Sequence, residues 1–300
     1  MTARAWAELL RVSALFTVPG DALAGAAAVG RRPDRSTALA VGASLCLYEA
    51  GMALNDWADR DEDAVDRPHR PIPSGRITPR AALTAAGALT AAGLALAARA
   101  GRPALGVATG LAATVWAYDL RLKHTPAGPA AMAAARGLDL LLGATATGAG
   151  ASARPTPTPG RALATAALLG AHTYAVTTVS RHETQGGSAA APLAALAAVA
   201  GIGGAVVRER PTSRGAARPA PSLLLTALTG AYLRTAARPL AHAALNPSPP
   251  LTQRAVGSGI RAMIPLQAAL AARAGAAGTG LAVMGLVPLA RALSRKVSPT

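Results

Sequence analysis

The stretch from Asn55 to Asp66 concentrates oxygen-bearing side chains at one point of the chain. It holds six of the fourteen acidic residues of the protein. If a helix runs through it, Asn55, Asp59 and Asp63 recur at every fourth position and share one face. Carboxylates so placed repel one another, and a divalent cation relieves the repulsion. Carboxylate and amide oxygens suit Mg²⁺, which also accepts oxygens from phosphate groups. The spacing therefore predicts a magnesium site that holds a diphosphate.

Two other interpretations of this stretch compete with that one. An EF-hand loop beginning at Asp59 needs glycine at its sixth position and glutamate at its twelfth. The sequence has Ala64 and Arg70 there, which excludes an EF-hand. In the other interpretation, arginines of the same stretch, Arg67 among them, pair with the acids, and the loop is solvated and binds nothing. This alternative stays open at the level of the sequence.

Long apolar blocks surround the acidic stretch and must position it. Most blocks run for about 17 to 25 residues, the length that crosses a hydrocarbon core as a helix. The whole chain has 51% hydrophobic and only 15% charged residues, and a soluble domain of this length carries more charge. An alanine-rich soluble bundle would need charges at every turn of an outer face, and the blocks lack them. We therefore expect an all-α, polytopic membrane protein.

Proline, glycine and arginine divide the apolar blocks into expected spans. These lie near residues 9–30, 37–56, 81–100, 103–119, 126–150, 161–180, 188–207 and 221–243. Residues 256–293 add either one span with an interfacial segment or two spans. We expect about nine transmembrane helices. No connection between them is long enough for a soluble domain, so residues 1–300 are expected to form a single domain.

The charges outside the acidic stretch indicate a membrane partner. The formal net charge is +16, but the basic residues lie in short connections between apolar blocks, not in one patch, which argues against nucleic acid. The acidic loop carries five basic residues between Arg60 and Arg80, so we expect it on the cytoplasmic side. Abundant arginine, alanine, glycine and proline suggest a bacterial source and its inner membrane. Cys46 is alone, which excludes an internal disulfide, and nothing indicates an oligomeric state.

The segment NDWADRDEDAVDRPHRPIPSGRIT resembles the first aspartate-rich motif of the UbiA family of intramembrane prenyltransferases. The resemblance implies a fold of nine transmembrane helices around a cavity open to lipid. It also implies that Asn55, Asp59 and Asp63 bind Mg²⁺, which in turn holds a prenyl diphosphate. Arg67 and Arg70, which follow in the same segment, are candidate contacts to the diphosphate.

A second segment, AYDLRLKHTP, is similar to the Tyr-x-x-x-x-Lys element of that family and gives Tyr118 and Lys123. Lys123 can neutralise a diphosphate oxygen, and Tyr118 can stabilise a developing cation through its ring or donate its hydroxyl. Together with Asp59 and Asp63 they are the candidate catalytic residues. The alternative is that Tyr118 and Lys123 anchor a helix end at the membrane interface.

The family's second aspartate-rich motif is expected after the sixth span, where this chain has TTVSRHETQGG. Glu183 is the candidate magnesium ligand there, while Arg181 and His182 are candidate contacts to the diphosphate. Alternatively, Arg181 and Glu183 neutralise each other at a helix end. This segment, with SALFTVPGDALAG and GIRAMIPLQAALAARAG, also resembles an EboC-like branch of the family.

The expected function is Mg²⁺-dependent transfer of a prenyl group from a prenyl diphosphate to an aromatic or hydroxyl acceptor. Two other classes stay open. In an ion-coupled transporter or exporter of small molecules, Asp21, Asp119 and Asp139 could carry protons or sodium ions. A non-catalytic membrane partner of a biosynthetic cluster is the third class. Arg136 lies one helical turn from Asp139, and the two are expected to pair.

Overall fold

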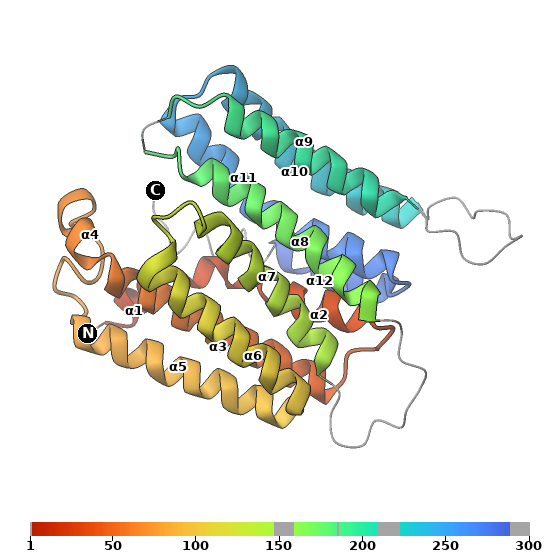
Figure 1. Ribbon diagram of the computed structural model, residues 1–300, viewed down its shortest axis with the longest axis horizontal. Helices are drawn as coiled ribbons and strands as arrows, with labels where there is room; N and C mark the ends of the chain where they lie inside the picture. The colour runs from red at the N-terminus through yellow and green to blue at the C-terminus, as the bar shows by residue number, and fades with distance from the viewer. Residues whose placement is uncertain (1, 147–158, 185, 209–222, 289–300) are drawn as a thin grey trace, which may run out of the picture.

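The computed structural model describes residues 2–146, 159–184, 186–208 and 223–288, which form helices joined by turns (Figure 1). The chain begins with α1 (Ala3–Leu9), the 3₁₀ turn η1 (Val12–Thr17) and α2 (Pro19–Ala28). The single span predicted for residues 9–30 is therefore wrong. Arg11 adopts a left-handed conformation with φ 48°, which ends α1. Pro19 then starts α2 at a position where a missing amide hydrogen costs nothing.

The other long helices follow the expected spans closely. They are α3 (Arg35–Ala58), α5 (Pro79–Ala100), α6 (Arg102–Ala117), α7 (Gly128–Thr145), α8 (Pro159–Ser180), α9 (Ala190–Val207), α10 (Leu223–Leu245), α11 (Pro249–Arg273) and α12 (Ala277–Met284). The short helix α4 (Arg60–Asp66) and the π-helical turn η2 (Tyr118–Leu122) lie between them. The expected end of one span at residue 150, the start of another at 221 and the last residues of the C-terminal stretch fall outside the described part.

Several helices begin at residues that satisfy or remove the free amides of a first turn. Asp34 caps α3 by accepting a hydrogen bond from the Thr37 amide at 2.9 Å, and Thr78 caps α5 in the same way. Proline occupies the first turn of α5, α6, α7 and α11. Within the described residues, five helices are long and apolar enough to cross a membrane, namely α3, α5, α9, α11 and residues Gly160–Ser180 of α8. The prediction of an all-α membrane protein is confirmed.

The helices form one bundle (Figure 1), and its two largest hydrophobic cores lie mostly in the first and the second half of the chain. In the first half of the chain, α3, α5 and α6 pack through small residues such as Ala43, Ala97 and Ala108. In the second half, α8 to α11 pack around Tyr232, Leu240 and Leu266. Helices α2, α7, α8 and α11 connect the two halves, and α4 projects at one end.

Close contact between α2 and α7 depends on glycine. A Cβ atom on Gly25 would lie 1.9 Å from the Leu140 carbonyl oxygen, and one on Gly143 would lie 2.1 Å from the Ala22 carbonyl oxygen. Both obstacles are backbone atoms, so a side chain cannot be accommodated by a rotamer change. The two helices must separate to admit even one methyl group.

Gly25→Ala is therefore expected to lower the thermal unfolding temperature of the purified protein in detergent, because overpacking costs about 1–3 kcal/mol. Gly87→Ala in α5 is the matched control, since no atom lies within 4 Å of its Cβ position. The control should unfold at the wild-type temperature or slightly higher, because alanine favours helix over glycine. Equal unfolding temperatures for the two variants would contradict this account of the α2–α7 contact.

Candidate active site

The first acidic motif keeps its helical register through a break in the backbone. Helix α3 ends at Ala58 and α4 begins at Arg60. The Asp59 amide nevertheless donates to the Asn55 carbonyl at 2.9 Å, and the Asp63 amide donates to the Asp59 carbonyl at 2.8 Å. The two helical turns therefore continue across the break, so Asn55, Asp59 and Asp63 recur at every fourth position of one helical path.

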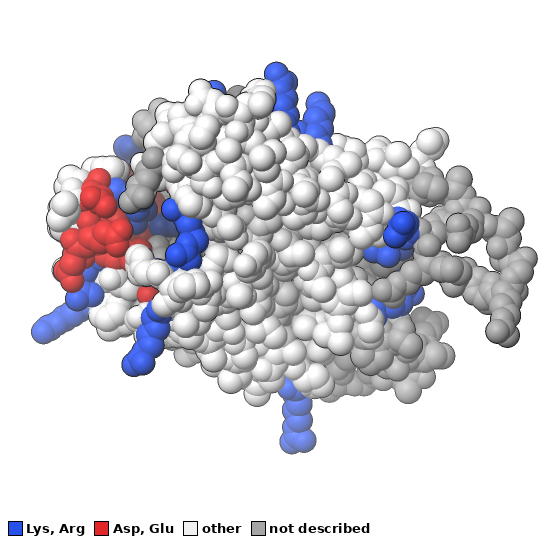
Figure 2. Space-filling model, turned by 45° about the horizontal axis from the view of Figure 1, so that its top comes forward, with Lys and Arg blue, Asp and Glu red and all other residues white. Residues whose placement is uncertain are grey.

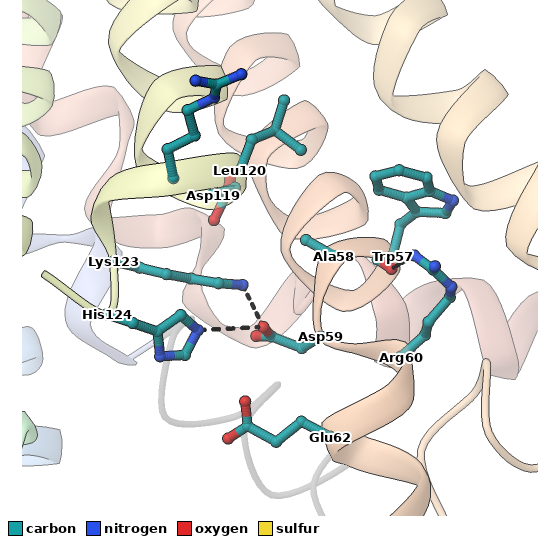
Figure 3. A pocket seen from close by; sticks show the side chains of 10 residues that line it. Trp57, Ala58, Asp59, Arg60, Glu62, Asp119, Leu120, Lys123 and His124 are labelled. Atoms are coloured by element: carbon teal, nitrogen blue, oxygen red, sulfur yellow. Dashed lines mark hydrogen bonds and ion pairs between the residues drawn. The ribbon is translucent and has the colours of Figure 1, made fainter.

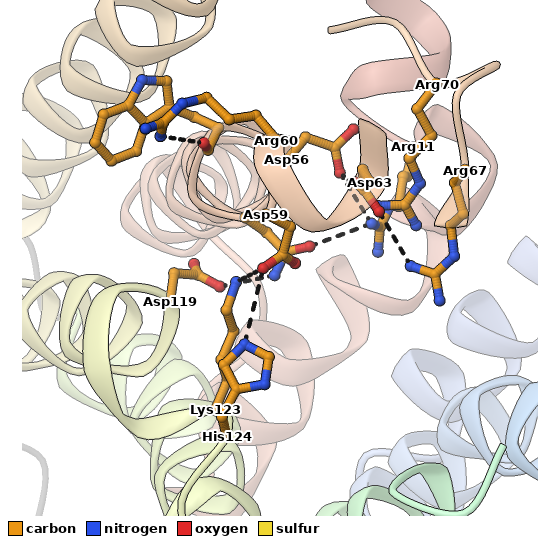
Figure 4. Close-up of polar contacts among 12 residues, drawn as sticks. Arg11, Asp56, Asp59, Arg60, Asp63, Arg67, Arg70, Asp119, Lys123 and His124 are labelled. Carbon is orange, nitrogen blue, oxygen red and sulfur yellow. Dashed lines mark hydrogen bonds and ion pairs between the residues drawn. The ribbon is translucent and has the colours of Figure 1, made fainter. Parts of the chain in front are cut away.

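Arginines hold the two buried acids of this motif. Arg70 donates from Nη1 to Asp63 Oδ2 at 2.6 Å and lies 3.5 Å from Asp56 Oδ1 (Figure 4). Arg67 Nη1 lies 3.4 Å from Asp63 Oδ1. Asp56 is 4% exposed and Asp63 is 1% exposed. The arginines do pair with acids, as the solvated-loop interpretation of this stretch expects. However, these acids are buried in a network of ion pairs and are not solvated.

Arg11 completes the network from the N-terminal segment. Its Nη2 donates to Asp56 Oδ1 at 3.1 Å and to Asn55 Oδ1 at 3.3 Å. Arg11 is the one non-glycine residue with positive φ in the part of the chain that the structure describes. Strained backbone of this kind is found where the surrounding contacts require it. Arg11 was not predicted to belong to the site, because the sequence places this residue inside a continuous membrane span.

The turn η2 brings a second set of polar groups against Asp59. The Lys123 amide donates to the Tyr118 carbonyl at 3.0 Å, an i to i+5 bond that sets the two residues one wide turn apart. The Lys123 ammonium forms an ion pair with Asp59, and His124 Nε2 lies 3.9 Å from the same carboxylate (Figure 3). The predicted catalytic residues Asp59 and Lys123 are therefore in direct contact.

Asp119 is a further residue of this site that the sequence analysis did not assign to it. Its Oδ1 accepts a hydrogen bond from Asn55 Nδ2 at 3.1 Å. Asp119 lies in η2, beyond the end of α6. Burial raises the pKa of Asp119 to about 6, and the hydrogen bond from Asn55 and the charge of Lys123 oppose this shift. Its position next to Tyr118 is the signal that could have identified it.

A cavity of about 280 Å³ opens between α4 and η2 (Figure 3). It is lined by Trp57, Ala58, Asp59, Arg60, Glu62, Asp119, Leu120, Arg121, Lys123 and His124. Asp59, Glu62 and His124 each offer a metal-ligating atom, and these atoms lie within 4.8 Å of one another. The predicted ligand Asp63 instead faces Arg67 and Arg70. Figure 2 shows the acidic side chains gathered at this end of the molecule, with basic side chains beside them.

The segment after α8 contacts the turn that follows η2. Glu183 in this segment is partly buried, which raises its pKa, and the positive charge of Arg67 opposes that rise. Arg181 donates from Nη1 to the Thr125 carbonyl at 2.6 Å, beside the end of η2. The Gly187 amide donates to the Pro247 carbonyl at 2.8 Å, which ties this segment to the α10–α11 turn.

Tyr118 begins the turn η2. It is partly buried, and burial together with the carboxylates of Asp119 and Asp59 raises the pKa of its hydroxyl, while Arg11 and Arg181 oppose the shift. The predicted residues of the first motif, η2 and Arg181 are therefore brought to one end of the bundle. His182 follows Arg181 at this end, and its amide donates to the Val179 carbonyl at 3.0 Å.

The structure is an all-helical membrane bundle with a network of acids, arginines and a lysine at one end, which defines it as a membrane-embedded protein with a charged polar site. The model of the UbiA prenyltransferase family matches residues 13–245, and the chain belongs to that family.

Relatives of this chain include digeranylgeranylglyceryl phosphate synthases. The digeranylgeranylglyceryl phosphate synthase of Halobacterium salinarum is 33% identical over 244 residues, which cover 79% of this chain and 84% of that protein. The synthase of Methanopyrus kandleri is 36% identical over 128 residues, 41% of this chain and 45% of the relative. The match to the second protein thus spans less than half of its length. These relatives are archaeal, so they do not support the bacterial source expected from composition.

Solved structures share the fold. A UbiA homologue from Aeropyrum pernix K1, described as an apo structure, superposes with a TM-score of 0.66 at 18% identity, covering 85% of this chain and 96% of that one. A UbiA homologue from Archaeoglobus fulgidus, bound to GPP and Mg²⁺, superposes with a TM-score of 0.57 at 18% identity, covering 94% of this chain and 99% of that one. The expected UbiA fold is confirmed.

Proposed function

We propose that this protein transfers a prenyl group from a prenyl diphosphate to an acceptor, with Mg²⁺ bound at the first motif. The observation that carries the proposal is the contact between Asp59 and Lys123 at the cavity between α4 and η2. A carboxylate there can hold a metal ion, and the adjacent ammonium can hold a phosphate oxygen. The family membership and the GPP- and Mg²⁺-bound homologue support the same chemistry.

The donor groups of the first motif fit a magnesium ion. Asn55, Asp59 and Asp63 recur at every fourth position of continuous helical turns and carry oxygens, the ligand type that Mg²⁺ prefers. Asp63 is held by Arg67 and Arg70, so a metal ion that binds Asp63 must displace them. Glu183 approaches from the opposite segment and is the proposed fourth ligand. When bound, Mg²⁺ supplies positive charge that stabilises the departing diphosphate. The arginines and Lys123 that hold these acids supply further positive charge at the same place.

The chain's own cations are proposed to bind the diphosphate. Lys123, Arg67 and Arg70 come from the first-motif side, and Arg181 and His182 come from the other. The C–O bond of the prenyl diphosphate breaks, and its electron pair leaves with the diphosphate, whose charge these side chains stabilise. The ring of Tyr118 faces the developing allylic cation. The acceptor forms the new bond and releases a proton.

The acceptor is proposed to be a hydroxyl group or an aromatic ring. The relatives' name describes a glyceryl phosphate that carries geranylgeranyl groups, which favours a hydroxyl acceptor. We further propose that residues 1–300 act as one domain, with the acidic loop on the cytoplasmic side. The resemblance of three segments to an EboC-like branch stays a prediction.

The proposal is tested by ligand-dependent stabilisation. Purified protein in detergent should unfold at a higher temperature with Mg²⁺ and geranyl thiolodiphosphate together, and neither alone should reproduce the shift. A ligand at one hundred times its dissociation constant stabilises by about 2.7 kcal/mol. Radiolabelled geranylgeranyl diphosphate should then be converted in the presence of a glyceryl phosphate ether or a phenolic acceptor. If prenyl diphosphates neither bind nor react at any Mg²⁺ concentration, the proposal is wrong.

A further inference from the structure

A second group of charged side chains lies deep in the bundle, apart from the candidate active site. This deep polar cluster consists of Asp21 on α2, Ser44 on α3, Arg136 and Asp139 on α7, and Gln267 on α11. Asp21 and Gln267 are fully buried, and Asp139 is 6% exposed. Each residue lies within a helix of the membrane-spanning bundle. Ionisable side chains inside a membrane are energetically unfavourable, and where they occur they pair with one another or mark a site for protons, ions or substrates.

Arg136 does not pair as the sequence predicts. It donates from Nη1 to Asp21 Oδ2 at 2.6 Å across the α2–α7 contact. Gln267 donates from Nε2 to Asp21 Oδ1 at 2.6 Å and to the Thr17 carbonyl at 2.7 Å. Both oxygens of Asp21 therefore accept hydrogen bonds from other helices. A carboxyl whose two oxygens both accept, one of them from a guanidinium, is an ionised carboxylate.

Asp139 has a different set of neighbours. Its Oδ1 accepts a hydrogen bond from the Ser44 hydroxyl at 2.5 Å. No salt bridge to Asp139 is found among the described residues, because Arg136, one turn earlier on α7, pairs with Asp21. A buried carboxyl without a cationic partner is strongly disfavoured in its ionised form. A proton on Asp139 removes that charge.

The charge balance of the cluster leads to the same assignment. Two ionised carboxylates and one guanidinium would leave a net negative charge in the bundle interior, where such a charge is strongly disfavoured. The other titratable groups that face Arg136 are Tyr48 on α3 and His172 on α8. The two ring nitrogens of His172 contact the Tyr232 hydroxyl and the Gly259 carbonyl, which the neutral ring satisfies. One bound monovalent cation therefore makes the cluster neutral.

We infer that this cation is a proton held on Asp139, so that the deep polar cluster is a proton-binding site inside the membrane-spanning bundle. The neutral acid accepts a hydrogen bond from Ser44, and Asp21 alone holds Arg136 and Gln267. These contacts join α2, α3 and α7 of the first half of the chain to α11 of the second. The inference concerns this cluster alone and does not depend on prenyl transfer.

Infrared spectroscopy tests the inference directly. At neutral pH the wild-type protein should show a carboxylic-acid carbonyl band that moves to lower frequency in D₂O. Asp139→Asn should lack this band, and Asp61→Asn should keep it, since Asp61 is an exposed acid whose side chain is 87% exposed. Ser44→Ala should keep the band and move it to higher frequency, because the carbonyl loses its hydrogen bond. A wild type without the band, or a band unaffected by both Asp139→Asn and Ser44→Ala, overturns the inference.

Thermal unfolding distinguishes the proton from a metal cation. Asp139→Asn should unfold near the wild-type temperature, because the amide is neutral like the protonated acid, has its size and can accept from Ser44. Asp21→Asn should unfold at a much lower temperature, because Arg136 then lacks its carboxylate. A wild-type unfolding temperature that rises with sodium, and no longer does so in Asp139→Asn, would assign the site to sodium and overturn the inference. Neither measurement uses a prenyl substrate, so a failure here leaves the proposed function standing.

Discussion

Asp59→Asn is expected to reduce prenyl transfer by about a thousandfold while the protein stays folded. Asp59 is the one predicted catalytic acid that both lines the cavity and contacts Lys123. The amide has the size of the carboxylate but lacks its charge, so it weakens a magnesium site and leaves Lys123 without its partner. Conversion of a radiolabelled prenyl diphosphate measures the loss. The stabilisation by Mg²⁺ with geranyl thiolodiphosphate should disappear in the same variant.

Asp61→Asn is the matched control for Asp59→Asn. Asp61 lies two residues away in α4, its side chain is 87% exposed, and it contacts Arg60 at 3.4 Å. Exposed ion pairs of this kind contribute little, so activity should stay within about twofold of wild type. Full activity of Asp59→Asn, or equal losses in the two variants, would remove Asp59 from the proposed mechanism.

The sequence predicted those parts of the site that depend on local helical geometry. The spacing of Asn55, Asp59 and Asp63 is a property of consecutive turns, and hydrogen bonds carry that register through the α3–α4 break. The spacing of Tyr118 and Lys123 is likewise set by one local hydrogen bond, which the Lys123 amide donates to the Tyr118 carbonyl. Long apolar helices were predictable for the same reason, because span length and apolar composition are local features.

Contacts between distant segments could not be predicted in this way. Arg11 reaches Asp56 over 45 positions of the chain, and Arg136 reaches Asp21 over 115. In both cases the sequence contains a nearer candidate partner for the arginine or the acid. For Arg136 and Asp21, the pairing follows from how α2 and α7 pack, and that packing depends on Gly25, whose Cβ position meets the Leu140 backbone. The Arg11–Asp56 pair instead joins the turn between α1 and η1 to α3.

Arg70→Met is expected to lower the stability of the protein by about 3 kcal/mol, because it leaves buried carboxylates without their counter-charge. Arg70 contacts both Asp63 and Asp56, whose side chains are 2% and 5% exposed. The methionine keeps much of the volume of the arginine stem, so the loss reports charge and not packing. Chemical or thermal unfolding in detergent measures the change. Arg67→Met is the control, because Arg67 is 44% exposed and lies 3.4 Å from Asp63, and about 1 kcal/mol or less is expected.

Magnesium should recover more stability in Arg70→Met than in the wild-type protein. In the wild type, Arg70 already neutralises Asp63, so a metal ion must displace it and gains little. In the variant, Asp63 keeps only the longer contact to Arg67 and Asp56 keeps Arg11, so a divalent cation meets less competition for the Asp63 carboxylate. The increase in unfolding temperature with Mg²⁺ should therefore be larger in Arg70→Met than in Arg67→Met. Equal responses would mean that Asp63 takes no part in binding the metal, and that Arg70 serves only to neutralise the buried acids.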